Sequence, residues 1–260
     1  MIVTLTTDFG ASEYVAAMKG VLLGMNKDVR IVDVRHDIAP GHVAEGAFAL
    51  YAAAPHFPFA VHVGVVDPGV GTSRRGVAVV CEGAIFVGPD NGLLMPAARR
   101  MGIKDVRELS NPAFWRHPVH PTFHGRDVFA PVAAHLTTGA KVADLGPSIR
   151  DPVDLDFGTA EATEDGFGAD VIYVDRFGNL VTNVPRADAE ARWSYGVAVR
   201  VEAGRHTFTA PFLRTYAMAG RGALLLTIGG HGLLEIAVNG GNAAQLTGLR
   251  LPDRVRLKEI

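Results

Sequence analysis

The sequence predicts a mixed α/β protein: an N-terminal, mostly parallel sheet with flanking helices, plus a smaller C-terminal antiparallel β domain. Short apolar runs alternate with helical patterns along the first 140 residues. This alternation is typical of parallel strands covered by helices. From residue 169 onward, the apolar runs are short and separated by Gly or Asn, as in small antiparallel domains. We therefore expect an N-terminal domain over residues 1–150 and a C-terminal domain over residues 165–260.

The N-terminal elements follow from apolar runs and from helical spacing. Apolar runs predict strands at Ile2–Thr6, Val29–Val34, Phe59–Val66, Gly76–Val80 and Ala84–Val87. Helical spacing or alanine-rich composition predicts helices at Glu13–Met25, His42–Ala53, Leu93–Met101 and Val128–Leu136. Pro55 marks the end of the second of these helices, because proline cannot continue a helix.

A polar stretch with Leu145-Gly146-Pro147 and Asp151-Pro152 predicts a linker before the C-terminal elements. Six strands are expected beyond it, at Val171–Val174, Leu180–Thr182, Val197–Val201, His206–Thr209, Ala223–Ile228 and Leu234–Val238. Their close spacing favours antiparallel hairpins, since parallel strands need long crossover connections.

Composition excludes several classes of protein. With 48% hydrophobic residues and a formal charge of −2, the chain is neither disordered nor a basic nucleic-acid binder. The lone Cys81 cannot form an internal disulfide, which favours a reducing compartment. No apolar run reaches the roughly 20 residues that cross a bilayer, and the N-terminus lacks the basic region of a signal peptide. We expect a cytoplasmic protein whose surplus apolar content covers subunit contacts.

Acidic residues follow three of the predicted strands. Asp8 follows the first strand, Asp67 the third, and Asp90-Asn91 the strand that ends at Val87. Ligands in open α/β sheets bind outside the carboxyl ends of the strands, so the set favours a binding site. Turns and helix caps are the alternative explanation for any one of these residues.

The loop Asp67–Gly76 is rich in glycine but is not a phosphate-binding loop. Its glycine spacing is not G-x-G-x-x-G, and a strand follows it instead of a helix. The planar guanidinium of Arg74 is suited to hold Asp67, since its donors match a carboxylate. A structural turn with a surface ion pair is the alternative.

Three histidines lie close together in the sequence: His117, His120 and His124. Such a cluster raises the possibility of a metal site. However, Pro118 and Pro121 prevent one helix from aligning the rings, so we expect no metal there. His124 lies in the segment Thr122–Asp127, which precedes a helix, and there it can meet a ligand and transfer a proton near neutral pH.

In the second domain, the segment Asp175–Asn183 predicts a tight hairpin with Gly178 and Asn179 in the turn. The amide of Asn179 both donates and accepts, so it is also suited to read an adenine edge. Gly229 to Gly232 allow close backbone approach to a ligand, although a simple turn explains them equally well.

Taken together, these segments resemble the S-adenosyl-L-methionine (SAM) hydroxide adenosyltransferases, also called SAM hydrolases, which are relatives of the fluorinase and chlorinase. The matching stretches occur in the family's order along nearly the whole chain: Thr6–Gly10, Tyr14-Val15, Met18–Gly20, Val66–Thr72, Gly88–Gly92, Thr122–Asp127, Asp175–Asn183 and Leu234–Asn239.

The resemblance implies hydrolysis of SAM to adenosine and L-methionine by a homotrimer with sites between subunits. The implied reaction needs no metal and no cofactor, and the implied partners include neither nucleic acid nor a membrane. The implied catalytic set is Asp67, Arg74 and His124, with Arg75 as the alternative arginine and either Asp67 or His124 as the proton acceptor. The implied substrate-binding residues are Asp8 for the ribose diol, Asn179 for adenine, Asp175 for the methionine amine, and Glu13, Thr122, Phe123, Gly230, Glu235 and Val238.

Three positions differ from the family pattern. Glu13 stands where relatives often carry Asp, and Gly230 where we expect Ser. Gly41, the third position, stands where the halogenating relatives carry an aromatic residue. In addition, the His124-Gly125 pair stands where those relatives carry a Tyr-Ser pair or similar, so we expect little or no halogenation.

Two other functions fit the same residues. Asp8, Asp67, Asn91 and His124 are also suited to hold the divalent ion of a metal-dependent phosphomonoesterase. A non-catalytic adenosine or SAM sensor would use the same pocket without turnover.

Overall fold

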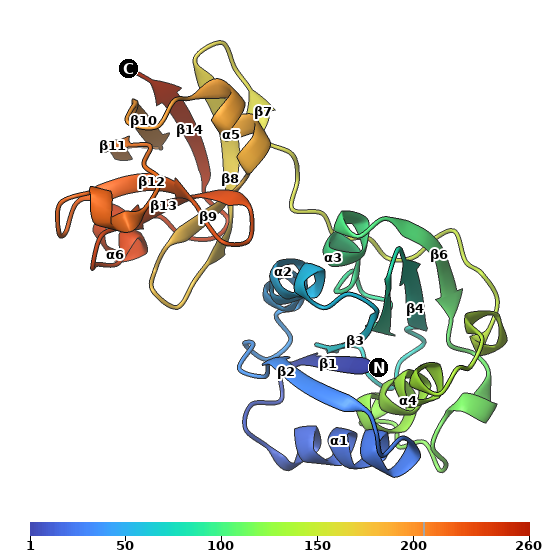
Figure 1. The fold of residues 1–260 in the computed structure, drawn as a ribbon. Helices are drawn as coiled ribbons and strands as arrows, with labels where there is room; N and C mark the ends of the chain where they lie inside the picture. Colours follow the sequence, from blue (N-terminus) through green and yellow to red (C-terminus); the bar gives the residue numbers. More distant parts are fainter. Residues whose placement is uncertain (205) are drawn as a thin grey trace. The chain divides into compact units, whose positions relative to one another are not determined.

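Residues 1–204 and 206–260 are described by the computed structural model, in which the chain divides into two units, Met1–Asp156 and Phe157–Ile260 (Figure 1). The first unit is a sheet covered by helices, and the second is built mainly of strands. Each unit has its own core of buried apolar side chains. The α/β fold class expected from the sequence is confirmed.

The first unit contains a six-stranded, mostly parallel sheet. Its strands are β1 (Ile2–Thr7), β2 (Arg30–Arg35), β3 (Ala60–Val65), β4 (Gly76–Cys81), β5 (Ala84–Pro89) and β6 (Ile103–Glu108). Their order is β2-β1-β3-β5-β4-β6, and β4 runs antiparallel to both of its neighbours. Since β1, β3 and β5 are adjacent and parallel, the polar residues that follow them lie at one edge of the sheet.

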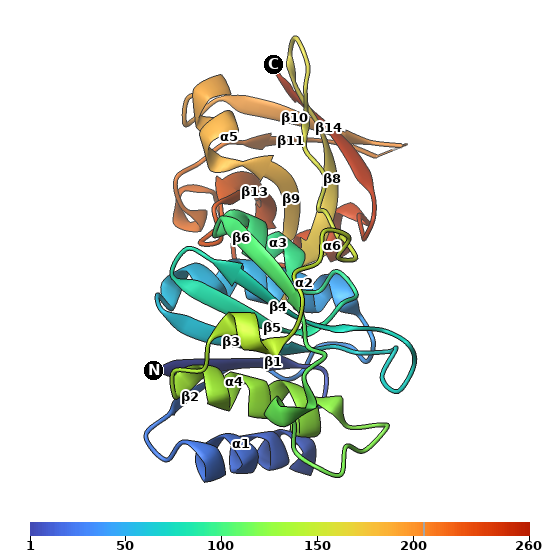
Figure 2. The ribbon, with the colours of Figure 1, turned by 90° about the vertical axis from the view of Figure 1, so that its right-hand side faces the viewer.

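Helices cover both faces of this sheet (Figure 2). One face carries α1 and α4, and the other carries α2 and α3. Their bounds are α1 (Glu13–Met25), α2 (Val43–Ala53), α3 (Met95–Arg100) and α4 (Ala130–Thr137). Met18 and Leu22 of α1 are fully buried among strand residues such as Leu5, which explains the helical spacing of apolar residues in the sequence.

Four short helical turns lie between or after these helices and strands. They are η1 (Ala54–His56), η2 (Pro112–Phe114), η3 (Gly125–Phe129) and η4 (Val142–Leu145). Pro55 lies within η1, since a proline lacking an N–H is tolerated at the first positions of a helical turn. The turn η3 is π-helical, and the backbone N–H of Ala130 bonds to the carbonyl of Gly125. This turn lies directly after His124, and it includes Val128, where we expected the following helix to begin.

Two predictions in this unit need correction. The helix expected at Leu93–Met101 extends only over α3, because Asn91, Gly92 and Leu93 form a turn before it. The strand β6 was not expected at all. Its residues Lys104, Asp105 and Arg107 interrupt the apolar pattern, as they do in strands at a sheet edge, where one side meets solvent.

The second unit is an antiparallel, nearly barrel-shaped sheet. Its strands are β7 (Glu161–Ala162), β8 (Gly166–Val174), β9 (Leu180–Pro185), β10 (Ala198–Ala203), β11 (His206–Pro211), β12 (Leu224–Ile228), β13 (Leu233–Val238) and β14 (Arg254–Glu259). Their order is β11-β10-β14-β8-β9-β13-β12, and a bridge between Phe212 and Leu226 brings the two ends of this order together. Short helices α5 (Arg186–Arg192), η5 (Tyr216–Met218) and α6 (Ala243–Thr247) connect the strands.

The strand β8 begins at Gly166 rather than at Val171, and β14 was not expected. In β14, buried Val255 and Leu257 alternate with charged residues, which is the pattern of a strand with one face in the core. The alternation covers only six residues, and the charged residues interrupt any apolar run, so the sequence pattern did not predict this strand.

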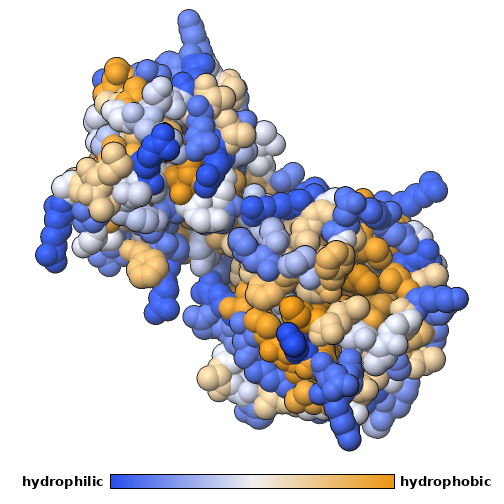
Figure 3. Space-filling view, in the orientation of Figure 1, coloured by the Kyte–Doolittle hydropathy of each residue, from blue (hydrophilic) through white to orange (hydrophobic). Residues whose placement is uncertain are grey.

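Apolar side chains gather on the surface of the first unit over the region where β1 begins (Figure 3). Phe59 is 76% exposed and Met1 is 60% exposed. Exposed apolar surface of this kind is typical of protein interfaces. Among the residues that the structure describes, no helix is both long and apolar enough to span a bilayer.

Candidate active site

The carboxyl ends of β1 and β3 border a cavity of about 310 Å³. Asp8 follows β1 and Asp67 lies two residues beyond β3, so the topology brings the two side chains to the same edge. The cavity is lined by Asp8, Phe9, Gly41, Val65, Asp67, Pro68, Val70, Thr122, Phe123, His124 and Gly125. Five of the predicted site residues therefore share one cavity, as expected for an open α/β sheet.

Arg74 connects Asp67 to His124. Its Nη2 atom donates to Asp67 Oδ2 at 2.6 Å and lies 2.9 Å from His124 Nδ1. The side chains of Arg74 and Asp67 are only 9% and 5% exposed, so this is a buried pair and not a surface ion pair. The Arg74 guanidinium also lies over the ring of Phe129, 5.4 Å from its centroid, which fixes its orientation.

These contacts determine the protonation of His124. A guanidinium only donates hydrogen bonds, so Nδ1 of His124 must accept from Arg74. The imidazole is therefore neutral and carries its proton on Nε2. Burial and the positive charge of Arg74 lower the pKa of His124, in agreement with this assignment.

Asp67 retains an unused acceptor. Its Oδ1 atom is buried and makes no hydrogen bond among the described residues. Burial raises the pKa of Asp67, although the charge of Arg74 acts in the opposite direction. The result is a carboxylate more basic than an exposed aspartate, beside a neutral histidine.

The neighbouring Arg75 binds different carboxylates from those of the cavity. It donates to Asp90 at 2.8 Å and to Asp151 at 3.0 Å, and Asp90 also accepts from the backbone of Val153. These bonds tie the segment after residue 150 to the end of β5. Of the two arginines left open by the sequence, Arg74 is the one that contacts Asp67 and His124, while Asp90 does not line the cavity.

Of the remaining predicted residues of the first unit, Asp8, Thr122 and Phe123 line the cavity and Glu13 does not. Asp8 Oδ2 accepts from the backbone N–H of Gly41 at 2.8 Å. Phe123 is 8% exposed and packs edge-to-face against Tyr14 and Phe9. Thr122 is exposed, and Glu13 is exposed at the start of α1.

The three clustered histidines point to different partners. His117 Nε2 lies 2.9 Å from the carbonyl of Pro112, and His120 Nδ1 lies 2.9 Å from Thr122 Oγ1. His124 contacts Arg74. Across residues 1–204 and 206–260, no group of three His, Cys, Asp or Glu side chains is arranged to hold a metal ion.

In the second unit, Asp175 and Asn179 meet at the tip of the β8–β9 hairpin. The Asp175 carboxylate accepts from the backbone and side-chain N–H groups of Asn179, both at 2.9 Å, and from the backbone of Phe177. Gly178 has φ of +83°, which a turn of this kind requires. The predicted hairpin is confirmed, and it presents the two polar residues together.

Glu235 lies on β13 and is only 2% exposed. Its carboxylate accepts from the Tyr216 hydroxyl and lies 3.3 Å from His231 Nε2. Val238, at the end of the same strand, is also buried, whereas Gly230 is exposed with open space where a Cβ would lie. Sequence reasoning missed Tyr216, because it lies 19 residues before Glu235 and only the fold brings the two side chains together. It also missed the contact of His231, which lies in the turn before β13, four residues before Glu235.

Comparison with protein-family models gives a match in each unit. Residues 3–146 match the SAM hydroxide adenosyltransferase N-terminal domain, and residues 169–256 match the SAM hydroxide adenosyltransferase C-terminal domain. The two matches occur in the order in which the units follow along the chain.

Full-length relatives are also similar. The (R)-S-adenosyl-L-methionine hydrolase of Salinispora arenicola is 43% identical over 267 residues, covering 98% of this chain and 97% of the relative. A more distant relative, the fluorinase of Nocardia brasiliensis, is 29% identical over 290 residues, covering 99% and 96%.

The fold is similar to that of a crystal structure of an uncharacterized conserved protein from Thermotoga maritima. The TM-score is 0.92 at 35% identity, with 99% of this chain and 100% of that one covered. Domain models and relatives agree along nearly the whole sequence, and the chain belongs to the SAM hydroxide adenosyltransferase family.

Proposed function

We propose that this enzyme hydrolyses SAM to adenosine and L-methionine by direct attack of water on C5′ of the ribose. The observation that carries the proposal is the buried Asp67–Arg74–His124 set beside a cavity at the carboxyl ends of β1 and β3. Relatives named as SAM hydrolases, similar over nearly the full chain, support the same reaction.

The chemistry needs little from an acid. SAM carries a sulfonium, so breaking the C5′–S bond leaves both electrons on sulfur and releases methionine as a neutral thioether. A new O–C5′ bond forms from water, and the proton of that water must be accepted. The reaction needs no metal, because the leaving group is already activated by its positive charge.

The geometry favours Asp67 as the proton acceptor. His124 uses Nδ1 to accept from Arg74, so its Nε2–H is a donor that can orient the oxygen of the water. Asp67 has the unused acceptor Oδ1 and a raised pKa, which suits a general base. Arg74 holds both groups in place, and such positioning contributes several kcal/mol to a reaction of this kind.

Substrate contacts are proposed on the same basis. Asp8 binds the ribose diol, Asn179 reads adenine, and Asp175 binds the methionine amine. Other contacts come from Glu13, Thr122, Phe123, Gly230, Glu235 and Val238. Gly230 has no side chain, so it contacts the methionine end without the hydroxyl expected at this position.

We further propose a cytoplasmic homotrimer with its sites between subunits. The exposed apolar surface of the first unit supports association. Three chains of 27.6 kDa give about 83 kDa, and light scattering on the purified protein measures this mass directly. A mass of one chain at assay concentrations would contradict the trimer.

The decisive assay incubates purified protein with SAM and separates the products by chromatography. Adenosine and methionine are expected, and in H₂¹⁸O the label must appear in the 5′-hydroxyl of adenosine. EDTA should leave the rate unchanged. Binding of adenosine without product would indicate a sensor, and label outside the 5′-hydroxyl would exclude direct attack by water.

The phosphomonoesterase alternative has weaker support. The Asn91 amide donates to the carbonyl of Val66 at 2.9 Å, and its Oδ1 accepts from the backbone of Leu93. The amide that this alternative needs as a metal ligand is therefore engaged with the backbone.

A further inference from the structure

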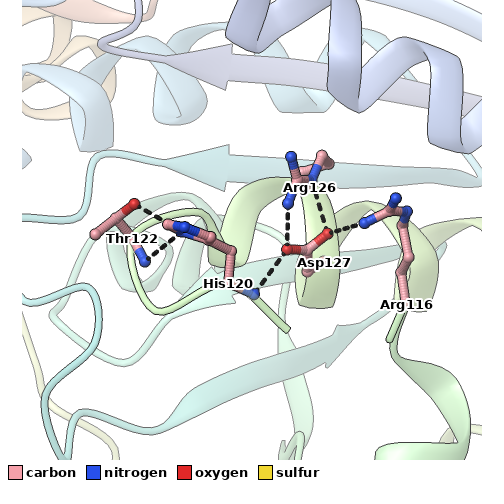
Figure 4. Close-up of polar contacts among 5 residues, drawn as sticks. All are labelled: Arg116, His120, Thr122, Arg126 and Asp127. Carbon is pink, nitrogen blue, oxygen red and sulfur yellow. Dashed lines mark hydrogen bonds and ion pairs between the residues drawn. The ribbon is translucent and has the colours of Figure 1, made fainter. Parts of the chain in front are cut away.

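Asp127 is a fully buried carboxylate that the proposed reaction does not use directly. Its Oδ1 accepts from Arg116 Nη1 at 2.9 Å and from Arg126 Nε at 2.7 Å. Its Oδ2 accepts from Arg126 Nη2 at 2.7 Å and from the backbone N–H of His120 at 2.9 Å. Figure 4 shows the two arginines and His120 converging on this one side chain.

The backbone of Asp127 closes the same segment. Its N–H donates to the carbonyl of Phe123, and its carbonyl accepts from the N–H of Arg116. Arg126, held by the carboxylate, also lies over the Phe123 ring at 4.8 Å from the centroid. Residues 120–127 therefore form a loop whose two ends are joined through Asp127.

His124 lies between the two joined ends. Its contact with Arg74 is a single 2.9 Å hydrogen bond to a residue 50 positions away. The direction of that bond depends on where the loop holds the imidazole. Buried carboxylates with several charged donors hold their neighbours rigidly, because any displacement leaves charges unpaired in a dry environment.

We propose that Asp127 is a positioning residue that acts through His124: by joining His120 and Arg126 to one buried carboxylate, it fixes the loop that aims the imidazole at Arg74 and at the attacking water. The inference rests on the proposed function, since its effect is measured in SAM hydrolysis.

The test is a double-mutant cycle measured on SAM turnover. Asp127→Asn should lower kcat about tenfold or more, since a misaimed acid–base group loses part of a contribution of roughly 10²–10⁴. In a His124→Ala background, Asp127→Asn should change kcat less than about twofold. Residues that act as one unit are non-additive in this way.

Asp105→Asn is the matched control. Asp105 lies on β6 of the same unit and pairs with Arg107 at 2.7 Å and with Ser148 at 2.6 Å, but it does not line the cavity. Its substitution should leave kcat within about twofold of wild type. Circular dichroism and thermal unfolding of every variant check that the fold persists.

If Asp127→Asn does not fold, Arg116→Ala replaces it in the cycle. That variant removes one of the four hydrogen bonds to the Asp127 carboxylate, and Arg116 itself is half-exposed. A smaller loss of kcat is therefore expected, and it should again be absent in the His124→Ala background. Equal losses in both backgrounds, for whichever variant folds, would overturn the inference. A wild-type protein that forms no adenosine from SAM would instead overturn the proposed function, and the inference with it.

Discussion

Asp8 and His124 line the same cavity but differ in what holds them. Asp8 accepts from the backbone of Gly41, while His124 contacts the Arg74–Asp67 pair. In the proposed reaction, Asp8 binds the ribose and His124 orients the water. Substitution of each residue should therefore affect different measurements.

Asp8→Ala should weaken adenosine binding about ten- to a hundredfold, since a hydrogen bond to a charged group contributes about 1.5–3 kcal/mol. His124→Ala should lower turnover of SAM by about 10²–10⁴ while adenosine affinity changes less than about threefold. Calorimetry with adenosine and product assays with SAM measure the two effects. Near-normal turnover in His124→Ala, or a loss of adenosine affinity equal to that of Asp8→Ala, would refute the role of His124.

Gly125 gives the cavity no side-chain donor for a halide. A halide must lose its water shell before it attacks, so it needs hydrogen-bond donors in a dry pocket, and Gly125 provides only its backbone. A Cβ at Gly125 would lie 3.3 Å from Met18 Sδ and 3.3 Å from a Val65 methyl, so Gly125→Ser also requires Met18 to move. We expect adenosine, and little 5′-halo-adenosine, from wild type and Gly125→Ser incubated with SAM and excess chloride. Halogenated nucleoside as a major product of either protein would contradict this.

At the scale of elements, two loops that carry the site pack directly on one another. Gly71, in the loop between Asp67 and Arg74, has φ of +79°, and a Cβ there would lie 2.6 Å from the carbonyl oxygen of Pro121. Pro121 precedes His124 by three residues. The glycine thus permits the close approach that brings Arg74 to His124.

Gly71→Ala should destabilise the protein by about 1–2 kcal/mol, because L-residues are strained in the left-handed region, and should lower kcat at least tenfold by displacing the Pro121 loop. Gly102→Ala is the control: Gly102 has φ of +74°, but a Cβ there meets nothing within 4 Å. It should show a similar loss of stability in urea unfolding with kcat unchanged. Equal effects of the two variants on kcat would show that the contact with Pro121 is unimportant.

Sequence patterns identified most elements because apolar runs and helical spacing reflect burial, as in Leu5 of β1 and Met18 of α1. They missed β6 and β14, where charged residues on the solvent side interrupt the runs. At the site, the pairing of Asp67 with Arg74 was expected from the match of a guanidinium to a carboxylate within one loop, and the structure shows it as a buried pair. The contact of Tyr216 with Glu235 joins residues 19 positions apart, and those of Arg116 and His120 with Asp127 join residues 11 and 7 positions apart. These contacts depend on how the chain turns between the partners, which residue type and spacing do not reveal.

At the scale of the whole molecule, the two units each hold part of the predicted set. Asp8, Asp67, Arg74 and His124 belong to the first, and Asp175, Asn179 and Glu235 to the second. Stability of the first unit is therefore a condition for the proposed chemistry. The core of this unit contains a buried histidine, His62, that does not line the cavity.

His62 lies on β3 in the core of the first unit, with 1% of its surface exposed. Its Nδ1 lies 2.8 Å from Thr4 Oγ1, and its ring stacks on Phe86 with the centroids 4.7 Å apart. Burial disfavours the charged form and lowers the pKa of His62 to about 4, whereas an unfolded histidine titrates near 6.5. Below pH 6.5 the unfolded chain therefore binds a proton that the folded chain does not.

The free energy of unfolding should consequently be highest above pH 6.5 and should fall as the pH decreases towards 4. At about 1.4 kcal/mol per pH unit, His62 alone accounts for a loss of about 3 kcal/mol over this window. In His62→Gln, which cannot titrate, the free energy of unfolding starts lower at pH 7 but should decline less steeply. Urea unfolding of both proteins at pH 7, 6, 5 and 4 measures the difference, and the other titrating groups cancel in the comparison. Parallel pH profiles for the two proteins would mean that His62 keeps an ordinary pKa in the folded state, and that its burial has no part in the acid sensitivity of the fold.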